Sequence, residues 1–141
     1  MSLHSVSVAA VVTNDAGQIL VIQRRDNGAW QIPGGVLELD ESILAGVRRE
    51  VEEETGLVVE PGRLTGVYKN IRRNVVALVF RAEVVGGTTQ PTEESTAVEW
   101  WPPDRVAAEM AETFAVRVLD ALDSGGVAVR LHDGAHLLAE Q

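Results

Sequence analysis

The chain has 141 residues, of which 45% are hydrophobic and 23% are charged, and it contains no cysteine. This length and balance predict one folded domain spanning residues 1–141, and the missing thiols exclude disulfide scaffolds, thiolate zinc sites and cysteine nucleophiles. The net charge of -9 argues against binding to a nucleic-acid polymer, which needs clustered lysine and arginine, but it allows small phosphorylated ligands held through divalent cations.

The sequence also gives an expectation about location. It has no apolar run near the roughly 20 residues that span a membrane. The first residues, MSLHSVSVAAVV, lack the basic segment that begins a signal peptide. We therefore expect a cytoplasmic protein with no membrane partner.

The N-terminal segment predicts two strands. Apolar residues alternate and then run together near Val6 to Thr13 and again near Ile19 to Arg24. The sequence NDAG between them has turn chemistry, so we expect the two strands to form a hairpin. The segment AWQIPGG then predicts a short extended piece that stops at Pro33 and its two glycines.

The next segment predicts a helix that begins near Ser42 and ends at Gly56. Asp40 or Ser42 can cap its N-terminus, and Gly56 is placed to adopt the left-handed conformation that stops a helix. An apolar stripe at helical spacing supports this assignment and comprises Ile43, Val47 and Val51, with Leu44 alongside.

The remaining elements predict an α/β fold. The segments LVVEPGRLTGVYKN and NVVALVFRAEVVGG predict two strands, and AVEWWPP predicts a shorter one stopped by prolines. A second amphipathic helix is expected from about Thr113 to Asp123, and the tail GGVAVRLHDGAHLLAEQ forms either an edge strand or a frayed end. Strands before and after the first helix indicate a mixed β-sheet sandwiched between helices.

The C-terminal end of the first helix, REVEEETG, carries an unfavourable concentration of negative charge. A helix C-terminus already bears partial negative charge, and like charges four residues apart repel. At about 100° per residue, Glu50, Glu53 and Glu54 border the apolar stripe, whereas Glu52 points to the far side. A divalent cation with a preference for oxygen ligands would offset this repulsion, although such a cluster taken alone is more often surface charge.

The surrounding residues carry a specific motif. The sequence GVLELDESILAGVRREVEEETGL, from Gly35 to Leu57, satisfies the pattern G-x5-E-x7-R-E-U-x-E-E-x-G-U, where U is a bulky aliphatic residue. It resembles the Nudix hydrolase family, and the resemblance implies a Nudix α/β/α sandwich. Many members have glycine at the position of Asp40, so the loop before the helix is expected to follow a slightly different path.

The resemblance implies hydrolysis of a nucleoside diphosphate linked to another moiety, with Mg²⁺ or Mn²⁺ as cofactor. In this family pattern Arg49 orients a glutamate through a charge-assisted hydrogen bond, and Glu41 braces the junction between loop and helix. The residues that correspond to the metal ligands are Glu50, Glu53, Glu54 and the carbonyl of Gly35.

The general base that accepts the proton of the attacking water has two candidates. Glu53 is the first, and Glu94 in the loop QPTEESTAVEW is the second, because family members place this base variously. A solvated loop is the plainer interpretation of the sequence around Glu94.

Three further residues are candidate substrate contacts. Arg24 ends a buried strand near the PGG turn, where a guanidinium could meet a phosphate, although pairing with a surface glutamate is nearly as good an interpretation. Trp30 is expected at the mouth of the site. Arg72 lies in the basic stretch YKNIRRN, which could contact phosphate or stack on a base, although solvated loop charge is the plainer interpretation.

Two other functions compete with the pyrophosphohydrolase. One is a nucleotide-sensing Nudix module without turnover, and the other is a structural domain with an acidic helix. The sequence does not choose among a nucleoside triphosphate, an oxidised nucleotide, ADP-ribose and a nucleotide sugar as substrate, because loops build the specificity pockets. The resemblance also allows a homodimer.

Overall fold

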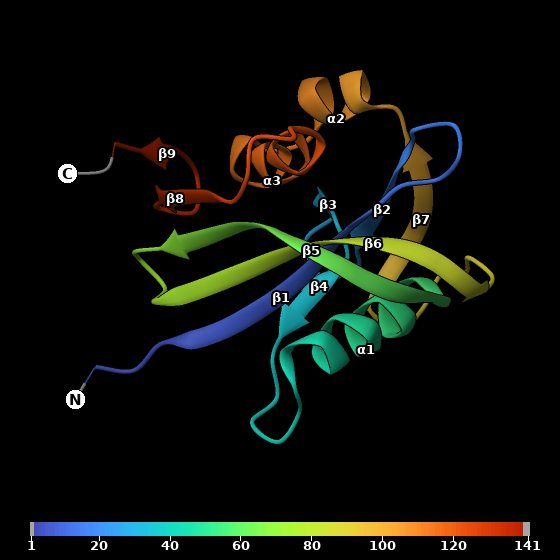
Figure 1. Ribbon diagram of the computed structural model, residues 1–141, viewed down its shortest axis with the longest axis horizontal. Coiled ribbons are helices and arrows are strands. Elements are labelled where there is room, and N and C mark those ends of the chain that lie inside the picture. The colour runs from blue at the N-terminus through green and yellow to red at the C-terminus, as the bar shows by residue number, and fades with distance from the viewer. Residues whose placement is uncertain (1, 140–141) are drawn as a thin grey trace.

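The chain folds into two β-sheets with helices packed against them (Figure 1). The computed structural model describes residues 2–139. In this range the elements are β1 (Ser5–Val12), β2 (Ile19–Arg24), β3 (Trp30–Gln31), β4 (Gly34–Val36), α1 (Ile43–Thr55), β5 (Leu57–Asn70), β6 (Val75–Gly87), β7 (Ser95–Trp101), α2 (Pro103–Glu109), α3 (Glu112–Leu122), β8 (Ala128–His132) and β9 (Leu137–Leu138).

The larger sheet is mixed and lies between helices, as predicted. Its six strands follow the order β4-β1-β6-β5-β8-β9, and the smaller sheet has the order β3-β2-β7. Strand β1 is parallel to β6, and β5 is parallel to β8, whereas the other pairs are antiparallel. Figure 1 shows α1 on one face of the larger sheet and α3 on the other. The α/β/α fold class is therefore confirmed.

Strand β1 shows how the sequence fills both faces of this sheet. Successive side chains of a strand point to opposite faces. Val8 and Val12 pack with the α1 residues Val47 and Val51 in one buried cluster. Val11 faces the other way and packs with Val118 and the small residues of α3. A strand covered on both sides needs apolar residues at every position, which explains the run VAAVV.

The predicted hairpin between the first two strands is wrong. One bridge, Thr13 to Ile19, joins the two segments, after which β1 and β2 enter different sheets. One edge of β1 is paired with β6 along its whole length, and β4 pairs with Ser7 to Ala9 on the other edge, where a hairpin partner would lie. Strand β2 pairs with β3 and β7 instead.

The predicted helices are confirmed, although their buried residues differ in part. Helix α1 has Ser42 as its N-cap, with Ser42 Oγ accepting from the amide of Ala45 at 3.2 Å, and Gly56 follows it at φ 81°. Ile43 at its first turn is 41% exposed, so the buried stripe begins at Val47. In α3 the fully buried positions belong mainly to small residues, which lets the helix lie close to the sheet.

The sequence did not indicate helix α2, and it left the structure of the C-terminal tail open. Helix α2 begins at Pro103, a residue that suits the first helical position because its missing N–H has no helical partner there. The C-terminal tail forms β8 and β9, which resolves the open choice between an edge strand and a frayed end for the described residues. In residues 2–139 no helix is long and apolar enough to cross a membrane.

Gly56→Ala should lower the free energy of unfolding by about 2 to 5 kcal/mol, measured by urea denaturation. The left-handed conformation accounts for about 1 to 2 kcal/mol of this loss, and a Cβ placed 2.5 Å from the carbonyl oxygen of Thr88 accounts for about 1 to 3 kcal/mol more. Gly17→Ala is the matched control, since φ is 75° there and the Cβ would meet no atom within 4 Å. Equal losses in the two variants would contradict the packing argument.

Candidate active site

Helix α1 places two buried carboxylates against the backbone of β4. Glu54 Oε1 accepts a hydrogen bond of 2.6 Å from the amide of Gly34. A Cβ on Gly35 would lie 2.5 Å from Oε2 of Glu50, so a glycine is required for this close approach. Glu50 is 8% exposed and Glu54 is 5% exposed. Gly35 therefore admits the Glu50 carboxylate close to the backbone, and the amide of Gly34 holds the carboxylate of Glu54.

Arg49 connects the acidic side chains at this end of the molecule. Its guanidinium donates to both carboxylate oxygens of Glu41, at 2.9 and 2.6 Å, and Nη1 donates to Glu50 Oε1 at 2.9 Å. It also donates to Glu53 Oε2 at 3.2 Å and to the carbonyl of Val36 at 3.2 Å. A planar guanidinium can hold several carboxylates in fixed orientations in this way. Glu41 thus contacts the helix residue Arg49 from the loop before α1, and its bracing role stays a prediction.

Burial and mutual repulsion act against ionisation of the two inner carboxylates. Burial raises the pKa of Glu54 to about 8, opposed by the hydrogen bond from Gly34 and reinforced by the charge of Glu50. Burial also raises the pKa of Glu50, although the hydrogen bond from Arg49 opposes this shift. By contrast, the hydrogen bond from Arg49 lowers the pKa of Glu41 to about 2. A bound cation would favour the ionised form of the inner pair.

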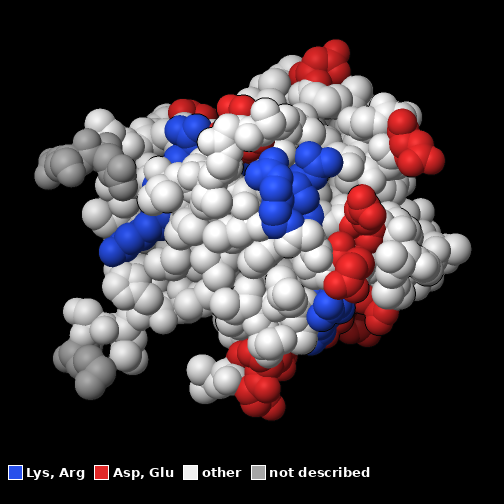
Figure 2. Space-filling view, viewed as in Figure 1, with Lys and Arg blue, Asp and Glu red and all other residues white. Residues whose placement is uncertain are grey.

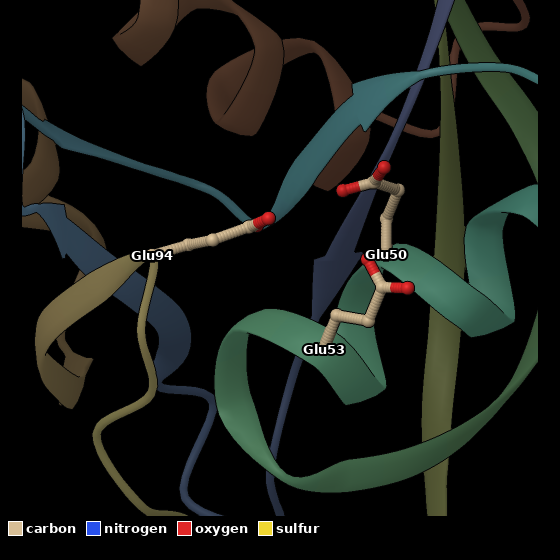
Figure 3. Close-up of side chains that lie close together, drawn as sticks. All are labelled: Glu50, Glu53 and Glu94. Atoms are coloured by element: carbon tan, nitrogen blue, oxygen red, sulfur yellow. The ribbon is translucent and has the colours of Figure 1, made fainter.

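A third element brings another carboxylate to this site. Figure 3 shows Glu50 and Glu53 projecting from α1, with Glu94 reaching toward them from the segment before β7. One oxygen from each of these three carboxylates lies within 4.8 Å of the others. A solvated loop was the plainer interpretation of the sequence around Glu94. In the structure this loop instead places Glu94 beside α1.

The loop that carries Glu94 is held by two residues that sequence reasoning missed. Arg25 donates to the backbone carbonyls of Glu93 at 3.1 Å and Thr92 at 2.8 Å, and its own amide donates to the carbonyl of Glu94 at 3.1 Å. Ser95, fully buried, donates from Oγ to the carbonyl of Glu54 at 2.6 Å. No local pattern marks either residue, because both contacts join segments far apart in the chain.

The donor set fits a hard divalent cation. Mg²⁺ takes oxygen ligands at about 2.0 to 2.1 Å in octahedral geometry, usually through one or two carboxylates together with water and substrate phosphates. The three carboxylate oxygens lie close enough for small side-chain rotations to bring them around one ion. Figure 2 shows acidic side chains gathered around α1 and the loop that precedes it. The arrangement can therefore concentrate cations at this surface.

The carboxylates open into a cleft of about 640 Å³. Its lining includes Arg24, Gly35, Glu50, Glu54 and Glu94. Glu53 lines an adjoining space together with Glu50 and Glu94. Arg24 is held by Asp26 through hydrogen bonds of 2.9 and 2.6 Å, and its side chain is 42% exposed. The structure thus gathers most of the predicted site residues, including the candidate phosphate contact, around one cleft.

Two predicted substrate contacts lie apart from this cleft. Trp30 packs on Trp101, with ring centroids 4.8 Å apart, beside the buried cluster beneath α3. Arg72 lies in the exposed turn between β5 and β6, where its backbone amide donates to Asn70 Oδ1. Neither residue lines the cleft that holds the carboxylates.

The chain is similar to a known family model, to relatives in other organisms and to a solved structure. The NUDIX domain family model matches residues 3–122. A MutT-like protein of Streptomyces ambofaciens is 59% identical over 136 residues, which cover 96% of this chain and 88% of that protein. An ADP-ribose pyrophosphatase of Methanocaldococcus jannaschii is 34% identical, covering 70% of this chain and 63% of that protein. The crystal structure of a MutT protein from Methanosarcina mazei Go1 superposes with a TM-score of 0.73 at 30% identity, covering 84% of this chain and 94% of that one.

Arg49→Met should lower the free energy of unfolding by about 3 kcal/mol in the absence of divalent cations, because hydrogen bonds to charged groups contribute about 1.5 to 3 kcal/mol each. Urea denaturation with and without Mg²⁺ measures this change in the free energy of unfolding. Added Mg²⁺ should recover part of the loss by neutralising the carboxylates. Arg48→Met is the control, since the exposed pair of Arg48 with Glu60 should contribute at most about 1 kcal/mol. A similar loss in both variants would refute the bracing role of Arg49.

Proposed function

Because the chain belongs to the NUDIX domain family and is a Nudix hydrolase, we propose that it is a metal-dependent pyrophosphohydrolase. Its substrate would be a nucleoside diphosphate linked to another moiety, cleaved by attack of water on phosphorus. The observation that carries this proposal is the convergence of Glu50, Glu53 and Glu94 beside a cleft that Glu50, Glu94 and Arg24 line together. Carboxylates attract cations, and Arg24 can contact a phosphate directly.

Some residues of this chain would hold the cofactor directly, and Arg49 would orient them. Glu50, Glu53 and Glu54, with the carbonyl of Gly35, would hold Mg²⁺ or Mn²⁺. When bound, the cation would neutralise charge on the diphosphate and lower the pKa of a bound water. Arg49 would keep the carboxylates of Glu50 and Glu53 oriented toward the cleft, because it already donates to both. Such outer contacts commonly determine ligand orientation.

The hydrolysis itself needs a proton acceptor. The water oxygen forms a bond to phosphorus, the phosphoanhydride P–O bond breaks on the opposite side, and the departing phosphate keeps the bond electrons. The proton of the water passes to a carboxylate within hydrogen-bond reach. Glu53 and Glu94 are the two candidates, because both belong to the carboxylate group that includes Glu50. Glu53 is also the more exposed of the α1 pair that Arg49 contacts, with a side chain 48% exposed.

The cleft accommodates the diphosphate that all the candidate substrates share. A diphosphate bound at the carboxylates would lie between α1 and Arg24, which line the same space. We keep nucleoside triphosphates, oxidised nucleotides, ADP-ribose and nucleotide sugars as candidate substrates. The relative named ADP-ribose pyrophosphatase supports the diphosphate linkage as the common feature.

Glu53→Gln should lower kcat by about 10²- to 10⁴-fold in the presence of Mg²⁺, the range of general base catalysis. The loss of a cation ligand would act in the same direction. The assay is release of phosphate or pyrophosphate from a panel of nucleotides. Glu52→Gln is the matched control, because it removes the same charge one residue away on the exposed side of α1. Near wild-type turnover in Glu53→Gln would overturn the assignment.

The variant Glu94→Gln tests whether Glu94 or Glu53 is the general base. If Glu94 is the base, its substitution should lower kcat as strongly as that of Glu53 and should remove the acidic limb of the pH profile of kcat. If Glu53 is the base, Glu94→Gln should raise the Mg²⁺ concentration needed for half-maximal activity and leave the shape of that profile unchanged. A variant with unchanged kcat and unchanged Mg²⁺ dependence would exclude Glu94 from the site.

A further inference from the structure

The segment that carries Glu94 also caps the C-terminus of α1. The last carbonyls of a helix have no partner within the helix and need one outside it. The amide of Gln90 donates to the carbonyl of Thr55 at 3.0 Å. Ser95, which is fully buried, donates from Oγ to the carbonyl of Glu54 at 2.6 Å. The segment is therefore tied to the helix at both of its ends.

Between these two ties the chain forms a compact turn around the side chain of Thr92. Thr92 Oγ1 accepts from the amides of Glu94 at 3.2 Å and Ser95 at 3.3 Å. The amide of Thr92 donates to the carbonyl of Ser95 at 3.0 Å. Threonine hydroxyls commonly close turns in this way. Most carbonyls of the turn then need a donor from another segment of the chain.

Arg25, directly after β2, supplies those donors. Its Nη2 donates to the carbonyl of Thr92 at 2.8 Å and, at a longer 3.4 Å, to that of Ser95, while Nε donates to the carbonyl of Glu93 at 3.1 Å. Its backbone amide donates to the carbonyl of Glu94 at 3.1 Å. One residue thus binds four successive carbonyls, three of them through its guanidinium. A planar guanidinium fixes orientation better than a single flexible donor does.

A β-bulge lies next to this turn. The pairing of β2 with β7 advances by one residue on β2, from Gln23 to Arg24, and by two residues on β7, so Thr96 is an extra residue. A bulge bends the strand that carries it and often aims a side chain near an active site. Figure 3 shows Glu94 extending from this end of β7 toward α1.

We propose that Arg25 is a positioning residue that holds Glu94 within reach of Glu50 and Glu53 before any ligand binds. The proposal rests on the nucleotide hydrolysis proposed above, in which Glu94 is a candidate base. One oxygen of each of these three carboxylates lies within 4.8 Å of the others. Arg25 acts on this group through the backbone of the turn, so its effect on the reaction passes through Glu94.

A direct contact between Arg25 and a phosphate is the alternative, since Arg25 also lines the cleft. Nε and Nη2 of Arg25 already donate to the carbonyls of the turn. A phosphate bound through those two nitrogens would release the turn that carries Glu94. The two roles therefore predict different kinetics for the same variant.

Arg25→Met should reproduce the kinetic defect of Glu94→Gln, because methionine keeps the length of the side chain and removes every donor. Loss of a residue that orients a metal site commonly costs about 10- to 100-fold in metal affinity or activity. We expect a change of this size in kcat or in the Mg²⁺ concentration for half-maximal activity, whichever of the two Glu94→Gln alters. The assay is nucleotide hydrolysis over a range of Mg²⁺ concentrations. A rise in the KM for nucleotide alone would indicate phosphate binding and overturn the proposal.

The double variant tests whether Arg25 acts through Glu94. In a protein that already carries Glu94→Gln, Arg25→Met should cost less than about twofold more, because substitutions that remove one shared contact are not additive. If the two effects multiply in full, or if Arg25→Met is defective while Glu94→Gln is not, Arg25 does not act through Glu94.

Arg63→Met is the matched control. Arg63 Nη2 likewise donates to two backbone carbonyls, those of Ala121 at 3.3 Å and Asp123 at 3.1 Å, at the end of α3. This variant should lose a comparable amount of stability and keep the wild-type kcat and Mg²⁺ dependence. The same kinetic defect in Arg63→Met would show that general loss of stability explains Arg25→Met, which would contradict the positioning role.

Amide hydrogen exchange tests the role of Arg25 without any turnover. In the nucleotide-free protein, Arg25→Met should speed exchange in residues 90–95 by at least about tenfold, the factor that corresponds to loss of one hydrogen bond to a charged group. Exchange in β1 and β6 should not change, because the turn opens locally. Unchanged exchange in residues 90–95 would refute the proposal. Absence of turnover in the wild type would refute the enzyme, and faster exchange of this segment would still support the positioning of Glu94 by Arg25.

Discussion

The site depends on the interaction of one guanidinium with a group of carboxylates that would otherwise repel one another. Arg49 contacts Glu41, Glu50 and Glu53 and also donates to the backbone of β4. These contacts fix the acidic end of α1 relative to the loop and strand in front of it. The single positive charge of Arg49 is nevertheless smaller than the total negative charge of these three carboxylates. In the function that we propose, a divalent cation among these carboxylates would complete the balance of charge.

The position of Arg49 and its carboxylates depends on the contacts of α1 with the larger sheet, with β4 and with the segment before β7. Val47 and Val51 hold α1 against the larger sheet, and Gly35 lets Glu50 approach the backbone. The hydrogen bond from Ser95 to the end of α1 then ties the segment before β7 to the helix. Through these contacts a hydrophobic core positions three carboxylates that come from two distant parts of the chain.

Local patterns predicted the parts of the molecule that local residues determine. The bounds of α1, its cap at Ser42 and its stop at Gly56 follow from short-range periodicity and backbone preference, and the motif located the acidic residues. The partner of β2 could not be predicted, because it depends on which strands already occupy the edges of β1. Arg25 was missed because it binds a carbonyl 67 residues later.

The most direct test of the account is to locate the cation. Crystals of the protein grown with Mn²⁺ and a non-hydrolysable nucleotide analogue allow anomalous scattering to identify the ion independently of any activity. We expect an anomalous peak between the carboxylates of Glu50 and Glu53, with the diphosphate of the analogue on its open side. A peak elsewhere, or nucleotide bound with no ion at these carboxylates, would contradict it.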